Sequence, residues 1–156
     1  MNWDARKEAV ASSSSSVHGK WCIFVSLSET EGVKFYETKK LRDEAAELQR
    51  EAAKYGLGPN VGAFCEMPII QSWDIPDNWE QYEIGYGYIT QKADTRSLTD
   101  EEFEELIDDL HYHGLSTSDL NQSLNCGIID GKPVRIDFDP VFYHANSENS
   151  LDDYEE

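Results

Sequence analysis

Three polar residues near the end of the chain have the types and spacing that phosphoryl transfer requires. Asp119 lies in a predicted loop, Asn125 precedes a predicted hairpin, and Asp137 follows the second apolar run of that hairpin. In phosphoryl transfer one carboxylate orients the accepting hydroxyl group, whereas an amide and a second carboxylate hold the Mg²⁺ that bridges the phosphates. Such groups must sit on short, rigid connections. The segment therefore favours a magnesium-dependent phosphate site.

The hairpin itself is indicated by a two-residue turn. Asp130-Gly131 stands between two apolar runs, which is a strong signal for a tight antiparallel turn. Strand alternation then places Val134, Ile136 and Phe138 on one face, and Arg135 and Asp137 on the other. We expect Asp137 to point away from the core, where it can bind a ligand.

The preceding residues predict the elements that must carry this hairpin. Four apolar runs are typical of strands, and two amphipathic stretches are typical of helices, the second opening with a capping box at Thr99. The expected order is two strands (21–25 and 33–36), a helix (38–55), two strands (61–70 and 82–90), a helix starting after Thr99, and the hairpin (126–138). This order is α+β, because strands and helices do not alternate as they do in βαβ folds.

Both ends of the chain differ in composition from the middle. Residues 1–19 contain the serine run 12–16 and are expected to form a flexible tail, and the acidic residues 145–156 a second one. One folded domain is therefore expected over residues 20–144.

Charge and cysteine content exclude several classes of protein. The 156 residues carry 13 Lys+Arg and 31 Asp+Glu, a formal net charge of −18, which disfavours nucleic-acid and membrane surfaces as direct partners and favours a basic protein. Three scattered cysteines exclude a disulfide framework and suit a reducing compartment. The N-terminal residues lack the apolar run of a secretory signal, so we expect a cytoplasmic protein.

Six segments together resemble the protein-kinase-like superfamily, in particular the short kinase-like proteins of bacterial viruses. They occur in the family's order and span about residues 21–139: 32–36, the helix after it, 56–61, 87–91, 118–125 and 136–139. The resemblance implies a minimal kinase-like α+β fold. Its N-lobe would be a small antiparallel sheet with one helix, and its reduced helical C-lobe would contain a β-hairpin.

The resemblance also assigns a nucleotide site. Lys34 would be the strand lysine that reaches the phosphates of ATP, with Glu44 of the following helix as its partner. Gln91 and Ala93 would bound the hinge against which adenine lies. Considered alone, a strand lysine is more often a solvated edge charge, and a glutamate beside an apolar stripe more often pairs with a nearby base or water.

The same resemblance gives roles to the residues introduced first. Asp119 would be the catalytic-loop aspartate, and Asn125 and Asp137 the ligands of Mg²⁺. In the family's catalytic loop four residues separate the aspartate from the asparagine, whereas five residues separate Asp119 from Asn125. If Asn125 is the metal-binding asparagine, Leu120 occupies the position of the catalytic base. Considered without the resemblance, Asp119 is also typical of a turn or helix-cap aspartate with no catalytic role.

Other departures concern phosphate binding and length. Residues 26–31, taken as the phosphate-covering loop, contain no glycine, and Asp139 replaces the glycine that normally ends the metal-binding motif. The 19 residues after Asp137 are too few for an activation segment and the helices that usually bind a peptide substrate.

Three functions follow as hypotheses. The first is a kinase-like protein without phosphotransfer, a pseudokinase that binds or inhibits a basic partner protein, such as a host protein. The second is a minimal Mg²⁺- and ATP-dependent phosphotransferase. The third is an acidic DNA mimic that inhibits a nucleic-acid enzyme, for which the acidic run 100–109 would have to form part of one surface.

Overall fold

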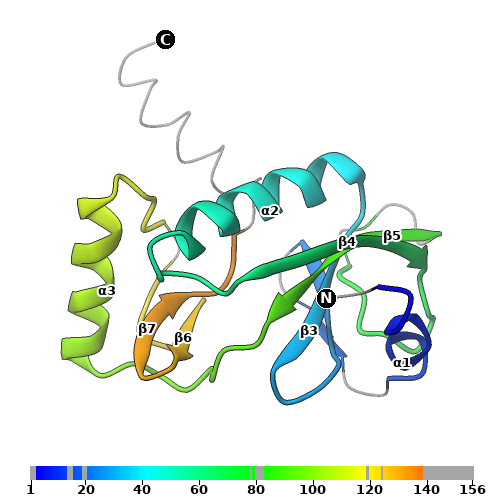
Figure 1. The fold of residues 1–156 in the computed structure, drawn as a ribbon, viewed down its shortest axis with the longest axis horizontal. Coiled ribbons are helices and arrows are strands. Elements are labelled where there is room, and N and C mark those ends of the chain that lie inside the picture. The colour runs from blue at the N-terminus through cyan, green and yellow to red at the C-terminus, as the bar shows by residue number, and fades with distance from the viewer. Residues whose placement is uncertain are drawn as a thin grey trace, which may run out of the picture. The chain divides into compact units, whose positions relative to one another are not determined.

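A computed structural model describes residues 3–13, 16–18, 21–77, 79, 83–118, 120–123 and 125–138 of the chain (Figure 1). The chain divides into two compact units. Unit 1 comprises Met1–Ala46 and Asn60–Lys92, and unit 2 comprises Glu47–Pro59 and Ala93–Glu156. One helix, α2 (Lys39–Ala53), contributes its first half to unit 1 and its second half to unit 2.

Unit 1 is built on one antiparallel sheet. Its strand order is β1-β2-β3-β5-β4, so that β3 lies between β2 and β5. The strands are β1 (Ser16–His18), β2 (Cys22–Ser26), β3 (Glu31–Tyr36), β4 (Val61–Pro68) and β5 (Ile84–Gln91). The first two expected strands are confirmed as β2 and β3, which pair antiparallel with Phe24 opposite Lys34. Gly32 of β3 lies against the ring of Phe24, because a Cβ atom at this position would overlap the ring.

The two faces of this sheet bury different side chains. One face packs Tyr36 and Tyr88 against Ala45 and Ala46 of α2. The other face carries the larger apolar cluster, which joins the strands to helix α1 and to the loop after β4: Val10, Ile23, Val25, Val33, Phe35, Cys65, Met67, Trp73, Trp79 and Ile89. Phe35 and Trp73 stack there with their ring centroids 5.1 Å apart.

The N-terminal segment differs from its expected role as a tail. Residues 7–11 form the short helix α1 (Lys7–Ala11), and Val10 is completely buried in the apolar cluster. β1 pairs with β2, and Arg6 forms an ion pair with Glu31 at 2.8 Å. The apolar residues before the serine run provide these contacts, since Trp3 and Ala11 pack with Val10 against the cluster, and Ser13 Oγ donates to the Ser26 carbonyl at 2.9 Å. The acidic segment 145–156 and the end of the expected domain lie outside the described residues.

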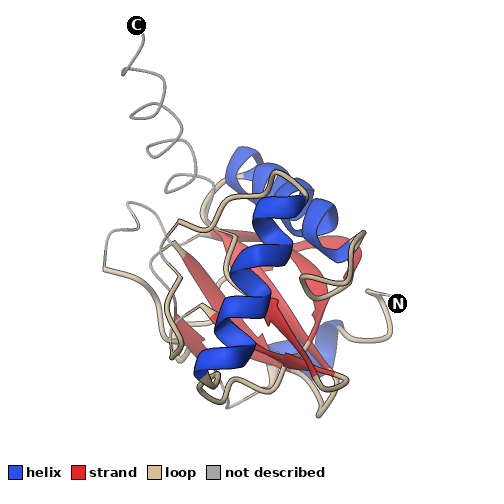
Figure 2. Ribbon diagram, turned by 90° about the vertical axis from the view of Figure 1, so that its left-hand side faces the viewer, coloured by secondary structure: helices blue, strands red, loops and turns tan. Residues whose placement is uncertain are grey.

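Unit 2 contains α3 (Asp100–Tyr112) and the hairpin β6 (Cys126–Ile129) and β7 (Lys132–Arg135) (Figure 2). The capping box is confirmed, since Thr99 Oγ1 accepts the Glu102 N–H and the Glu102 carboxylate accepts the Thr99 N–H. Leu106 and Leu110 of α3 pack with Ala52, Leu57 and Phe138 in the core of this unit. The end of α2 is held by Lys132, whose Nζ donates to the Tyr55 carbonyl at 3.4 Å.

The hairpin departs from the expected alternation at one residue. Val134 and Phe138 are buried as expected, but Arg135, expected on the outward face, is only 2% exposed. Alternation predicts which side of a strand a residue occupies. It does not predict that both sides of a short hairpin are covered by the rest of the unit.

The α+β class is confirmed by the antiparallel sheets and the helices of the two units. Among the described residues, no helix has both the length and the apolar character needed to cross a membrane.

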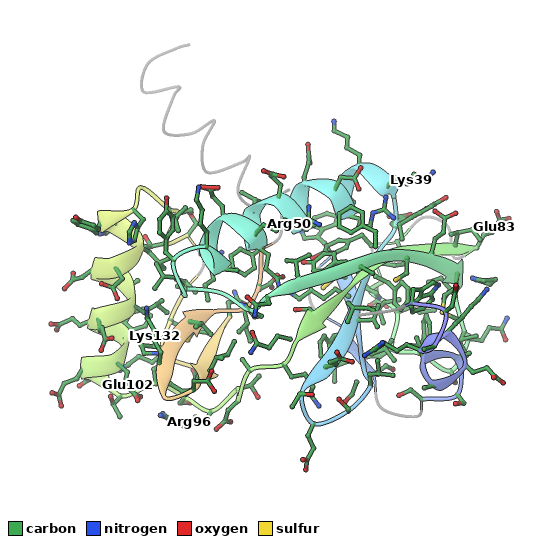
Figure 3. All side chains as sticks on the ribbon, in the orientation of Figure 1. Lys39, Arg50, Glu83, Arg96, Glu102 and Lys132 are labelled. Atoms are coloured by element: carbon green, nitrogen blue, oxygen red, sulfur yellow. The ribbon has the colours of Figure 1, made fainter. Side chains whose placement is uncertain are left out.

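The start of α3 holds a charged pair with an altered pKa. Arg96 donates two hydrogen bonds to the Glu102 carboxylate, at 2.9 and 2.8 Å (Figure 3). These bonds, assisted by the Thr99 N–H, lower the pKa of Glu102 from 4.5 to about 2. Because the folded state has the lower pKa, the charged carboxylate stabilises α3 above the unfolded pKa, and this contribution disappears as the pH falls toward 2.

We predict that Glu102→Gln removes this pH-dependent contribution. The difference in urea midpoint between wild type and variant, followed by far-UV circular dichroism, should be largest near neutral pH and shrink between pH 4.5 and about 2. Arg96→Gln should remove the larger part of this contribution, because the Thr99 N–H still donates to Glu102 in that variant. A difference that stays constant over this pH range would mean that the Arg96 pair does not set the pKa.

We further predict that Val10→Ala destabilises unit 1 by about 2 kcal/mol, because it deletes buried methyl groups and leaves a cavity. All four tryptophans (Trp3, Trp21, Trp73 and Trp79) belong to unit 1, so tryptophan fluorescence during urea unfolding reports on this unit. Val17→Ala, at a side chain that is 59% exposed, is the control and should cost much less. Equal, small effects of both substitutions would restore the interpretation of residues 1–19 as a tail.

Candidate functional site

The two predicted magnesium ligands of unit 2 are neighbours across the β6–β7 hairpin. Cys126 pairs with Arg135 in the register of the ladder, and the next hydrogen bond runs from the Ile136 N–H to the Asn125 carbonyl at 3.0 Å. Asp137 is the residue directly after this bond. Asn125 and Asp137 are both half-buried. The hairpin register therefore brings the main chain of Asn125 beside Ile136, the residue that precedes Asp137, although the two predicted ligands are twelve positions apart in sequence. Binding of one cation by both side chains stays a prediction.

Asn125 adopts a backbone conformation that few residues accept. Its φ is 65°, and among the described residues Asn125 and Asp130 (φ 51°) are the non-glycine residues with positive φ. Asp130 and Gly131 (φ 78°) form the hairpin turn, where such values are required. Asn125 lies at the opposite end of the hairpin, outside the turn. Asparagine tolerates this region better than most residues, and strained positions of this kind are concentrated at functional sites.

The ring of Phe138 fixes the chain directly after Asp137. Phe138 is 1% exposed and packs in the core of unit 2. Gly58, which follows α2, makes room for it, because a Cβ atom at Gly58 would lie 3.0 Å from Phe138 Cζ and 3.0 Å from the Ala52 Cβ. Asp137 thus stands between a ladder hydrogen bond on one side and a buried ring on the other.

In unit 1 the predicted lysine and glutamate come from the two elements that meet on one face of the sheet. Lys34 shares its face with Tyr36, which packs against α2, and it is only 7% exposed. β3 is an interior strand, so the alternative of a solvated edge lysine is wrong. Glu44 is half-buried on α2, next to Ala45.

The predicted hinge residues lie where the chain passes from unit 1 to unit 2. The boundary falls between Lys92 and Ala93. Gln91 is bound to Asn60 twice, since its N–H donates to the Asn60 carbonyl and its side-chain oxygen accepts the Asn60 N–H, both at 3.1 Å. Ala93 is half-buried. Adenine binding at these two residues stays a prediction.

Asp119, the predicted catalytic aspartate, lies outside the described residues, as does Asp139. The segment just before Asp119 is ordered by serine side chains, because Ser116 Oγ accepts the Ser118 N–H at 3.1 Å and hydrogen-bonds to Ser118 Oγ at 3.0 Å. Local order therefore extends to the residue immediately before Asp119.

The donor set of unit 2 suits a hard cation. An amide oxygen and a carboxylate are the kinds of ligand that Mg²⁺ takes, usually together with water and substrate phosphates. Among the described residues there is no group of three or more His, Cys, Asp or Glu that could hold a metal ion. A cation at Asn125 and Asp137 would therefore need additional oxygens from a ligand such as a nucleotide.

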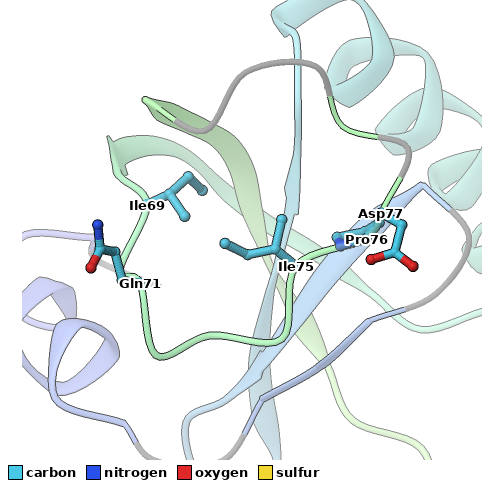
Figure 4. Close-up of a pocket in the computed structure, with 5 residues that line it drawn as sticks. All are labelled: Ile69, Gln71, Ile75, Pro76 and Asp77. Atoms are coloured by element: carbon cyan, nitrogen blue, oxygen red, sulfur yellow. The ribbon is translucent and has the colours of Figure 1, made fainter.

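Two other features of unit 1 do not contain predicted site residues. A surface pocket of about 470 Å³ is lined by Ile69, Gln71, Ile75, Pro76 and Asp77, in the loop after β4 (Figure 4). Cys65 is buried, and this burial raises the pKa of its thiol to about 12, which keeps the thiol protonated and unreactive.

Sequence reasoning missed Arg135 and Gly58 as parts of this site. Strand alternation predicts an outward-facing Arg135, and Gly58 enters the sequence analysis only within the segment 56–61. The one usable signal was the position of Arg135 two residues before Asp137.

Comparison with protein-family models, with curated proteins and with solved structures finds no match.

We predict that Gly58→Ala destabilises unit 2 by about 1–3 kcal/mol, because the added methyl group overpacks Phe138 and Ala52. Unfolding followed by far-UV circular dichroism measures the cost. In a Phe138→Leu background the same substitution should cost less, because the shorter side chain removes one of the two close contacts. An identical cost in both backgrounds would show that Gly58 does not make room for the ring.

Proposed function

We propose that this protein is a kinase-like domain that binds a magnesium–nucleotide complex through Asn125 and Asp137. The observation that supports the proposal is the hydrogen bond from the Ile136 N–H to the Asn125 carbonyl, which fixes the main chain of Asn125 beside the residue that precedes Asp137. Mg²⁺ would neutralise phosphate charge there. The chain supplies two ligands and the phosphates supply others.

Two features of unit 1 support the same proposal. The helix between β3 and β4 and the antiparallel strand order are consistent with the N-lobe that the resemblance implies. The nearly buried Lys34 is the kind of group that would bind the phosphates of a nucleotide, with Glu44 as the carboxylate that fixes its position. Asp119 would be required in addition if the domain transfers a phosphoryl group.

The biological output of such a domain would be the binding of a basic partner protein. The net charge of −18 supports this part of the proposal, because it accelerates association with positively charged surfaces.

We predict that Mg²⁺–ATP raises the Tm of the wild-type chain, since a ligand that binds only the folded state stabilises it by about 2.7 kcal/mol at a concentration of 100 Kd. Asp137→Asn should abolish the shift. Asn125→Gly should abolish it too, and glycine accepts the φ of 65° at this position without strain.

Asp130→Asn is the matched control. It removes one carboxylate from the same hairpin at an exposed turn position and keeps a residue that tolerates positive φ, so its shift with Mg²⁺–ATP should equal that of the wild type. No shift in the wild type, or an unchanged shift in both site variants, would exclude the proposed function.

A further inference from the structure

Arg135 is a buried charge with an unusual set of acceptors. It is the largest of the fully buried side chains in the described part of the molecule. Its Nε–H donates to the Asp137 carbonyl at 2.8 Å, and its Nη1–H donates to the Ser116 carbonyl at 3.3 Å. The guanidinium carbon lies 5.8 Å from the centroid of the Phe138 ring. Because a guanidinium stays charged and costs free energy to bury, such contacts must offset its desolvation.

The two acceptors belong to the two segments that carry the candidate acidic groups. The Asp137 carbonyl is the main chain of the predicted magnesium ligand itself. Ser116 starts the turn that orders the chain up to Ser118, the residue before Asp119. One planar group therefore spans the chain before the predicted catalytic aspartate and the chain at the predicted metal ligand.

We propose that Arg135 is a positioning residue, which joins the segment 116–118 to the segment 136–138 and thereby holds Asp137 in place for a cation. The effect of Arg135 on cation binding rests on the proposed function. The link between the two segments does not depend on it. Arg135 does not bind the cation. It acts through the main chain of Asp137 on one side and through the ring of Phe138 on the other.

The chemistry of the two carbonyls requires an arginine. A guanidinium presents five N–H donors in a rigid plane, so it can hold two acceptors in fixed directions at once. A lysine would keep the positive charge but offer one compact ammonium on a flexible stem. Arg135→Lys therefore removes the fixed geometry and retains the charge, which is the property that the test needs.

The test compares the full-length wild type, Arg135→Lys and Arg50→Lys, an equivalent substitution at an exposed residue of α2. Amide hydrogen exchange is measured for peptides that cover 115–118 and 136–138. The affinity for Mn²⁺ in the presence of ADP is measured by electron paramagnetic resonance, because Mn²⁺ takes the same oxygen ligands as Mg²⁺. Circular dichroism verifies that each variant is folded.

We expect Arg135→Lys to exchange faster in both peptides and to bind Mn²⁺–ADP about tenfold more weakly, the usual loss when a group that orients a metal ligand is removed. Arg50→Lys should match the wild type in both measurements. Unchanged exchange in Arg135→Lys would overturn the link between the segments. Faster exchange with unchanged Mn²⁺ affinity would overturn the positioning of Asp137.

Failure of the proposed function gives a different result. A wild-type chain that binds no Mn²⁺–ADP would exclude the magnesium–nucleotide site and the effect of Arg135 on it, whereas the exchange data would still decide whether Arg135 joins the two segments. If Arg135→Lys does not fold, the link is tested in the wild type by amide exchange at low urea concentrations. Segments joined by Arg135 should open together, so the peptides 115–118 and 136–138 should show the same dependence of exchange on urea, and different dependences would overturn the link.

Discussion

The register of the β6–β7 hairpin is the constraint on which the candidate site depends. A slip of one residue would break the bond from the Ile136 N–H to the Asn125 carbonyl and so shift Asp137 along the chain of β6 relative to Asn125. The turn at Asp130 and Gly131 fixes this register, since both residues accept the positive φ values of a two-residue turn. At the open end of the hairpin, the Ile136 N–H donates to the carbonyl of Asn125, the residue with positive φ. Strain at Asn125 is thus compatible with the fold because the ladder determines the conformation around it.

Unit 2 also shows how a small core accommodates a permanent charge. Arg135 is enclosed by its own hairpin end, by the Ser116 segment and by the Phe138 ring, and carbonyl oxygens take the place of water around it. Phe138 in turn requires the absence of a side chain at Gly58. These contacts are local to unit 2, yet they connect residues from the end of α2 to the end of β7. A polar group buried in this way specifies one arrangement of the chain more strongly than apolar packing alone.

Unit 1 separates its structural and candidate functional contacts by the two faces of one sheet. The face that holds Val10, Phe35 and Trp73 carries the larger apolar cluster of this unit. The opposite face meets α2 through Tyr36 and Tyr88, and this is the face on which Lys34 is buried. A lysine that is nearly excluded from water on an interior strand is costly without compensation. Its position therefore distinguishes it from the exposed charges that give the chain its acidic character.

The sequence by itself determined the features that depend on local patterns. Periodicity and turn chemistry predicted α2, the capping box of α3, the strands β2 and β3 and the turn at Asp130-Gly131, because each is specified by residues close together in the chain. The α+β class followed from their order. Tertiary structure alone decided that Val10 is buried, that both sides of Arg135 are covered, and that Phe138 fits against Gly58. Each of these features depends on contacts between residues far apart in sequence. The alternation or composition of one segment does not predict which side chains of another segment pack against it.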